Sequence, residues 1–342
     1  MIPKTLRRGM LLTPLLALLS GCSNLVVMNP SGDIAKQEAQ LIIVSVVLML
    51  LIIVPVFFLI IWFAYKYRAS NTEAAYEPDW DHSTKLELVI WGAPLLIIIV
   101  LGLVTWISTH KLDPYRPLDR IAENRPIPAS AKPLVIQAVA MDWKWLFIYP
   151  EQGIATVNEL VVPVDVPLRF KVSATSVMNA FYVPELAGMV YGMPGMEITL
   201  NAVQNKAVKS VGFSSNYSGA GYSDMRFSYT GVAQGDFDAW VQKAKAQGEG
   251  KLNRANYLTL EKPSIKEPAR LFSAVDDDLY YRILNRCVAD GGVCQDKMMN
   301  DDAKKAREMA MVRYAPQQAA TTRLAQANGE VCTTPNDPVK KK

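Results

Sequence analysis

The sequence predicts a membrane protein in which two transmembrane helices, forming a helical hairpin, are followed by an all-β sandwich outside the membrane and a helical extension at the C-terminal end. Two observations predict this class: two long apolar runs without a charge, and a later series of short segments rich in β-branched and aromatic residues. The 342 residues suffice for one or two folded domains besides the spans. The net charge of +4 is small, and no basic stripe interleaves with aromatic residues, which argues against nucleic-acid binding.

The N-terminal residues have the pattern of a secretory signal. Lys4, Arg7 and Arg8 precede the apolar run "LLTPLLALLS", which is too short to span a bilayer. The run ends in "LLSGC", which resembles the processing site of bacterial lipoproteins, where cleavage leaves a cysteine that carries a diacylglyceryl group. We therefore expect a lipoprotein signal peptide over residues 1–21 and lipid attachment at Cys22. The alternative is an ordinary signal peptide with a chance cysteine.

Two later apolar runs are long enough to cross a membrane. Residues 41–64 and residues 88–109 carry no charge, and each run exceeds the roughly 20 residues that the hydrocarbon layer requires. Tryptophan and tyrosine residues lie near the ends of the runs, where they suit the membrane–water interface. We expect transmembrane helices over residues 40–65 and 86–109.

The lipid anchor predicts the topology. A lipid on Cys22 places residues 22–39 in the periplasm, so the first helix runs inward and residues 66–85 form a cytoplasmic loop. Everything after the second helix is then periplasmic again, beginning with a proline-rich, charged linker over residues 110–130. We therefore expect a protein of the bacterial inner (cytoplasmic) membrane with a large periplasmic domain.

The part beyond the linker changes from strand to helix patterns. Alternating segments separated by proline and glycine predict a β-sandwich over residues 131–235. The segments "FDAWVQKAKA" and "DDDLYYRILNRCVAD" then predict a helical, aromatic-rich region over residues 236–298. The polar residues 299–342 predict a flexible tail.

The loop "GFSSNYSGAGYSDM", residues 212–225, has the small residues and turns of a loop built around a ligand. Together with the order of anchor, spans and sandwich, it resembles subunit II of the haem–copper oxidases. In the cytochrome c oxidases of that family, the sandwich is a Greek-key cupredoxin that binds a dinuclear copper centre through histidine, cysteine, methionine and a glutamate carbonyl. The resemblance implies a cupredoxin-like fold for this chain. The residues at the six ligand positions are Asn179, Ser214, Asn216, Ser218, Tyr222 and Met225.

The chemistry of a copper site is missing from these six positions. Thiolate and imidazole are the ligands that hold copper, but serines stand at both cysteine positions, and Asn179 and Tyr222 stand at the histidine positions. The two histidines of the chain are His82 and His110, and none of its four cysteines lies in the predicted sandwich. We therefore expect a copper-protein fold that lacks the dinuclear copper site, and no metal or redox centre bound by this chain.

Within the family, the copper-free members are the bacterial quinol oxidases of the cytochrome bo type, and "MDWKWLFIYPEQGIATVNEL" and "SVMNAF" resemble their subunit II. The resemblance implies a subunit of a proton-pumping terminal oxidase, which couples ubiquinol oxidation and the reduction of oxygen to water to proton translocation. Haems and copper would lie in the partner subunit I, with subunits III and IV as further partners and no cytochrome c.

Two alternatives stand beside this interpretation. The missing ligands argue against the first, a copper-containing cytochrome c oxidase subunit. The second is a free lipoprotein whose copper-free, cupredoxin-like sandwich acts as a binding or assembly module.

Glu87 is the last charged residue before the second apolar run, on the expected cytoplasmic side. The simple interpretation is an acid at a helix N-terminus, stabilised by the helix dipole and by water. Ionisable groups at the edge of the hydrocarbon also mark proton pathways. The resemblance places a glutamate here at the mouth of a proton channel into subunit I, and therefore implies proton entry at Glu87.

Cys287 and Cys294 flank a "DGG" turn in a compartment expected to be oxidising, so a disulfide can form between them. Cys332 is a third thiol on that side. The three thiols allow three pairings, and the sequence does not choose among them.

Overall fold

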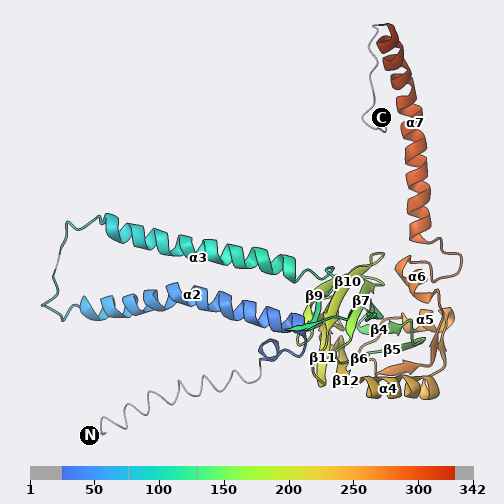
Figure 1. Ribbon diagram of the computed structural model, residues 1–342, viewed down its shortest axis with the longest axis horizontal. Coiled ribbons are helices and arrows are strands. Elements are labelled where there is room, and N and C mark those ends of the chain that lie inside the picture. Colours follow the sequence, from blue (N-terminus) through green and yellow to red (C-terminus); the bar gives the residue numbers. More distant parts are fainter. Residues whose placement is uncertain (1–24, 76, 129, 328–342) are drawn as a thin grey trace.

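The computed structural model describes residues 25–327, except positions 76 and 129, with side chains through residue 311. Figure 1 shows two long helices side by side, a β-sandwich at one end of this pair, and a third long helix that points away from the sandwich. The predicted fold class is confirmed: membrane-length helices, a β-rich domain and a C-terminal helical extension follow one another along the chain.

The hairpin consists of α2 (Asp33–Lys66) and α3 (Thr84–Lys111). Both helices are long and apolar enough to cross a membrane, and the most apolar stretch of each is unburied within the chain. Apolar surface of this length requires lipid or partner helices around it. The expected spans, residues 40–65 and 86–109, lie within these two helices.

Helix α2 begins at Asp33, before the expected span, because its first turns pack on the sandwich. Asp33, Ala35 and Ala39 are buried there. The Oδ2 atom of Asp33 accepts hydrogen bonds from Arg120 Nε at 2.9 Å and from Gln37 Nε2 at 2.8 Å. The tertiary partner Arg120 and the partner Gln37, one turn along the same helix, stabilise a helix start that hydropathy alone does not predict.

The described residues contribute 11 strands to the sandwich. Their bounds are β3 (Leu134–Met141), β4 (Lys144–Tyr149), β5 (Ile154–Val157), β6 (Glu159–Pro163), β7 (Pro167–Ala174), β8 (Asn179–Val183), β9 (Ala187–Gly192), β10 (Ile198–Val203), β11 (Val208–Ser214), β12 (Arg226–Val232) and β14 (Arg270–Phe272). One sheet has the order β10-β7-β3-β4-β5-β14, and the other has the order β6-β12-β11-β8-β9. The pairs β3–β7 and β6–β12 are parallel. A parallel pair needs a long connection between its strands, so both sheets depend on contacts between segments that are far apart in the sequence.

Aromatic side chains fill the space between the two sheets. The rings of Trp145, Phe147, Phe181 and Phe227 are fully or almost fully buried and lie 5.0–6.4 Å apart, mostly in edge-to-face pairs. Such arrangements suit the charge distribution of aromatic rings and add to the apolar area that they bury. This core holds the loop that follows β11 in place, because Met225 of that loop also belongs to it.

The linker after α3 is seated on the sandwich. Asn201 of β10 donates from Nδ2 to the carbonyl oxygens of Pro114, Tyr115 and Arg116 at 3.1–3.3 Å. Beyond these residues, β1 (Arg120–Ala122) pairs with β2 (Arg125–Pro126). The linker predicted over residues 110–130 is thus attached to the chain's own sandwich.

The region after the sandwich contains both helices and short strands, whereas its sequence pattern predicts helices over residues 236–298. Its short strand β14 pairs antiparallel with β5 and extends the larger sheet. A second apolar cluster, which includes Tyr257 and Leu279, packs this region against the outer face of the same sheet. The other elements of the region are α4 (Gln234–Gln247), β13 (Lys251–Leu252), α5 (Arg254–Leu260), β15 (Ala274–Val275) and α6 (Leu279–Leu284).

The segment after this region differs from the expected flexible tail over residues 299–342. It forms the helix α7 (Gln295–Ala327), and the residues beyond it lie outside the described part of the chain. The helix has a physical reason in the composition: residues 295–327 contain no glycine and are rich in alanine, glutamine, lysine, arginine and methionine. These are strong helix formers. The polarity that indicates a tail is therefore equally compatible with a solvated helix.

Candidate functional site

Three of the six ligand positions form one hydrogen-bonded cluster at an end of the sandwich. Asn179 Oδ1, at the start of β8, accepts a hydrogen bond from Ser214 Oγ at the end of β11, at 3.1 Å. The same hydroxyl lies 3.3 Å from the carbonyl oxygen of Asn216, whose Nδ2 donates to the carbonyl of Met178 at 3.0 Å. Asn179 and Ser214 are buried. The neutral amide and hydroxyl groups thus satisfy one another and close the base of the loop.

The side chains at the other three ligand positions lie in different surroundings. Met225 is fully buried in the aromatic core. Tyr222 lies in a short 3-10 turn, η3 (Tyr222–Asp224), and meets Tyr217 edge to face with ring centroids 5.6 Å apart. Ser218 Oγ is buried and has no hydrogen-bond partner among the described residues. These three side chains therefore take no part in the hydrogen bonds that join Asn179, Ser214 and Asn216.

Trp143 is a residue of this site whose role the sequence does not reveal. It sits in the turn between β3 and β4 with a left-handed backbone, φ 68°, and its Nε1 donates to the carbonyl of Ser218 at 3.1 Å. Its indole ring covers the loop so closely that a Cβ atom on Gly221 would lie 2.5 Å from ring atoms. The close approach requires glycine at that position. The glycines in the loop sequence indicate that another group approaches the loop closely, but they do not show that this group is Trp143.

The chemistry available at this end of the sandwich is hydrogen bonding. Hydroxyl and amide groups are far weaker copper ligands than thiolate or imidazole. Within the described part of the chain, no group of three or more histidine, cysteine, aspartate or glutamate side chains is placed to hold a metal ion. The arrangement is suited to holding a loop conformation.

Lys144 fastens the aromatic-rich region to the sandwich. Its side chain is almost fully buried in β4, and Nζ donates to the carbonyl of Lys262 at 2.8 Å and to Ser264 Oγ at 2.6 Å. Ser264 in turn donates to Glu267 at 2.8 Å. Burial lowers the pKa of Lys144, against the opposing effect of Glu267. The sequence shows only a lysine in a strand pattern, because its partners lie about 120 residues further along.

Glu87 lies in the first turn of α3, with Ser83 preceding the helix. Its Oε1 atom is 2.7 Å from Nδ1 of His82, and Nε2 of the same ring lies 3.1 Å from Thr84 Oγ1. The Glu87 and His82 side chains are 51% and 62% exposed, so water reaches both groups. The structure thus pairs the sequence-predicted acid with one of the two histidines of the chain.

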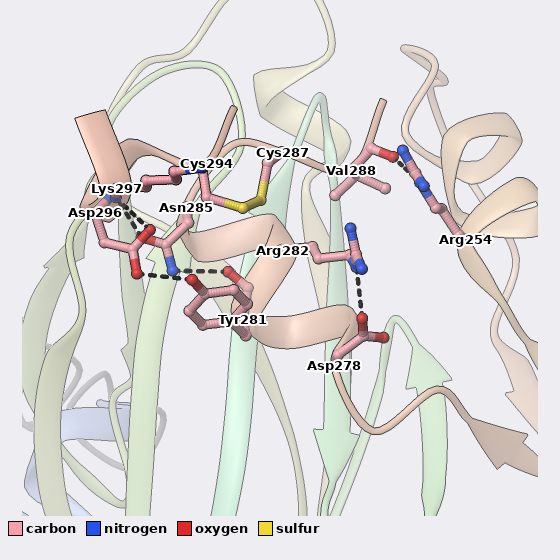
Figure 2. Close-up of a disulfide and its surroundings, with 10 residues drawn as sticks. All are labelled: Arg254, Asp278, Tyr281, Arg282, Asn285, Cys287, Val288, Cys294, Asp296 and Lys297. Carbon is pink, nitrogen blue, oxygen red and sulfur yellow. Dashed lines mark hydrogen bonds and ion pairs between the residues drawn. A yellow bond between two sulfur atoms is a disulfide. The ribbon is translucent and has the colours of Figure 1, made fainter. Parts of the chain in front are cut away.

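Cys287 and Cys294 are bonded through their sulfur atoms. Figure 2 shows this disulfide beside the start of α7, where Tyr281 donates to Asp296 at 2.7 Å and Asn285 Oδ1 accepts from the Asp296 backbone at 3.3 Å. The bond and these contacts connect α6 to the first turn of α7. The expected lipid-bearing Cys22 and the third thiol, Cys332, lie outside the described residues.

The comparisons with known proteins agree with this architecture. The model of the COX Aromatic Rich Motif family matches residues 245–291, the segment that contains α5, β14 and α6. The chain is 47% identical over 269 residues to cytochrome bo(3) ubiquinol oxidase subunit 2 of Pseudomonas putida, covering 79% of this chain and 82% of the relative. It is 42% identical over 280 residues to ubiquinol oxidase subunit 2 of Acetobacter aceti, covering 82% and 87% respectively.

One solved structure in the comparison is the periplasmic domain of subunit II of cytochrome oxidase from Bradyrhizobium japonicum. It is 25% identical, with a TM-score of 0.32, and covers 33% of this chain and 94% of that chain.

Two membrane-length helices, a β-sandwich and a segment that matches the COX Aromatic Rich Motif family define a membrane-anchored oxidase subunit. The identities to these relatives, and the shares of both chains that the matches cover, show the protein family. The chain belongs to the ubiquinol oxidase subunit 2 family, and is thereby a component of an oxidoreductase complex of the respiratory chain. The resemblance drawn from the sequence is confirmed.

Proposed function

We propose that this chain is the copper-free subunit II of a proton-pumping ubiquinol oxidase. The observation that carries the proposal is the Asn179–Ser214 hydrogen bond, which joins two neutral side chains where a histidine and a cysteine would bind copper in a cytochrome c oxidase. Without a metal in the sandwich, electrons enter the complex elsewhere. Ubiquinol delivers them to the partner subunit I, whose haems and copper reduce oxygen to water.

The chain's own contribution is structural support and proton entry. Its two helices pack on subunit I within the bacterial inner membrane, with subunits III and IV as further partners, and its sandwich covers subunit I on the periplasmic side. Glu87 collects protons at the cytoplasmic end of α3. The support for this role is a water-accessible carboxylate at the edge of the hydrocarbon, 2.7 Å from an imidazole that also exchanges protons with water.

A copper measurement tests the loss of the metal site. The isolated segment from Ile127 to the C-terminus is expected to fold and to bind no copper after incubation with Cu²⁺ and removal of excess metal. Replacing Asn179 and Tyr222 by histidine, Ser214 and Ser218 by cysteine, and Asn216 by glutamate is expected to create a purple copper-binding site. The Asn216→Glu single variant is the matched control and should remain colourless. Stoichiometric copper and a purple colour in the unaltered segment would contradict the proposal.

Lipid attachment is proposed for Cys22, which would be the N-terminal residue of the mature chain. Cys22→Ala is expected to leave the signal peptide uncleaved and the chain without a lipid. The oxidase should still assemble, because two membrane spans anchor a chain far more strongly than acyl chains do. Mass spectrometry of the N-terminal peptide checks this, and a mature chain that begins at another residue would be the opposing result.

A further inference from the structure

A charged cavity of about 500 Å³ lies where the membrane hairpin meets the sandwich. Its walls come from the start of α2, the end of α3, the linker, β9 and β10, which adjoin one another in Figure 1. The cavity therefore sits at the end of both spans, at the depth where lipid headgroups meet water. Neither the copper-ligand positions nor Glu87 belongs to it. Its charged lining residues are Asp33, Glu38, Lys111, Asp113, Arg116, Asp119 and Arg120.

The cavity continues into an apolar groove along the helices. A second cavity, of about 480 Å³, shares Glu38, Leu112, Asp113 and Pro114 with the first and reaches down between α2 and α3. A third, of about 500 Å³, shares Thr105 and Thr109 with the second. It runs along α3 beside apolar side chains of which Ile98 and Trp106 are 65% and 68% exposed. The polar end and the apolar end thus form one continuous surface.

Most of the charged side chains that line the first cavity are already paired with one another. Arg120 binds the buried carboxylate of Asp33 at 2.9 Å, and Arg116 binds Asp119 at 2.9 Å. Asp113 accepts a hydrogen bond from a backbone N–H of its own turn at 2.9 Å. Lys111, Glu38 and Asp113 remain without an ion pair to another described residue, so the lining holds one unpaired cation beside two carboxylates.

Glu38 is largely enclosed. Its carboxylate lies so close to the backbone of Gly188 that a Cβ atom on that glycine would be 2.5 Å from Glu38 Oε1. An enclosed carboxylate that is not paired with a cation of the chain is stabilised by a cation at its open side.

We propose that this cavity and groove form a binding site for one phospholipid with a primary-amine headgroup, of the phosphatidylethanolamine class. Lys111 binds the phosphate, Glu38 accepts from the ammonium group, and an acyl chain lies along α3. Binding this headgroup needs both a cation for its phosphate and a carboxylate for its ammonium group. A glycerol headgroup supplies no cation for Glu38, and a choline headgroup has no N–H to donate to its carboxylate.

The test uses the whole oxidase complex, purified through a tag on this chain, stripped of loosely held lipid and titrated with single phospholipids under native mass spectrometry. Wild-type complex is expected to bind one phosphatidylethanolamine more tightly than phosphatidylcholine or phosphatidylglycerol. Lys111→Ala and Glu38→Gln are each expected to weaken that binding by about tenfold, the effect of losing one charge-assisted contact. Lys36→Ala is the matched control, because Lys36 is exposed, pairs with Glu123 and does not line the cavity.

Each variant must retain the haem content and quinol turnover of the wild type, so that a loss of lipid is not a loss of folding. The effects on lipid affinity and headgroup preference do not depend on where copper or quinol binds. Equal binding by Lys111→Ala and by Lys36→Ala would overturn the proposal. So would equal affinity for the three headgroups, or cryo-electron microscopy density showing a partner polypeptide in the groove.

Discussion

Replacing Glu87 by alanine is expected to lower ubiquinol oxidase turnover at least about tenfold while leaving the complex assembled, as loss of a positioned proton-transfer group does. A proton-collecting group must bind and release protons in contact with water, which a methyl group cannot do. Glu87→Gln keeps the size and hydrogen bonding of the side chain but not its acidity, so it should be equally severe. Glu87→Asp retains the carboxylate and should be mild.

The defect in the Glu87 variants should appear as slow haem reduction at the oxygen site, measured by stopped-flow absorbance. Haem content and subunit composition should be unchanged. Asp81→Asn is a suitable control, because it removes an acid from the same loop without touching the pair formed with His82. Full turnover in a correctly assembled Glu87→Ala complex would leave Glu87 as an acid that merely stabilises the start of α3.

The largest expected effect on stability is that of Trp145→Ala. The indole is fully buried between the sheets, with the rings of Phe147, Phe181 and Phe227 at 5.5–6.3 Å. Truncation leaves a large cavity and is expected to cost about 3–5 kcal/mol of unfolding free energy. For a domain of this size that corresponds to a fall in melting temperature of roughly 10 °C.

Thermal unfolding of the detergent-solubilised chain, followed by near-ultraviolet circular dichroism, measures this effect. Trp145→Phe should cost much less, because the ring contacts remain and the indole Nε1 has no hydrogen-bond partner to lose among the described residues. Tyr217→Ala is the surface control: the side chain is 76% exposed, so the change should stay within about 0.5 kcal/mol. A Trp145→Ala chain that melts with the wild type would mean that the aromatic cluster does not hold the sandwich.

The spans and the sandwich could be predicted because their signals are local. Long uncharged runs and alternating β-branched segments follow from backbone hydrogen bonding and burial alone. The beginning of α2 could not be predicted, because Asp33 is helical through a partner, Arg120, that lies 87 residues away. Helix α7 could not be predicted for a different reason: a polar composition fits a solvated helix as well as a flexible tail.

The candidate site likewise has one feature that the sequence predicts and others that it does not. The absence of thiolate and imidazole at the six ligand positions could be predicted, because it depends only on residue types. The contacts that replace a metal could not be predicted. Asn179 reaches Ser214 across 35 residues, and Trp143 covers Gly221 only because the β3–β4 turn adopts a left-handed backbone. Such contacts depend on the order of the strands, which the sequence pattern does not define.

Purifying the complex from membranes in mild detergent, through a tag on this chain, tests whether the chain is a copper-free subunit of a quinol oxidase. We predict recovery with haem, oxygen consumption with ubiquinol but not with reduced cytochrome c, and no copper on this chain once it is separated from its partners. Recovery without haem would contradict it in favour of a binding or assembly lipoprotein. Oxidation of cytochrome c with copper on this chain would contradict it in favour of a cytochrome c oxidase subunit.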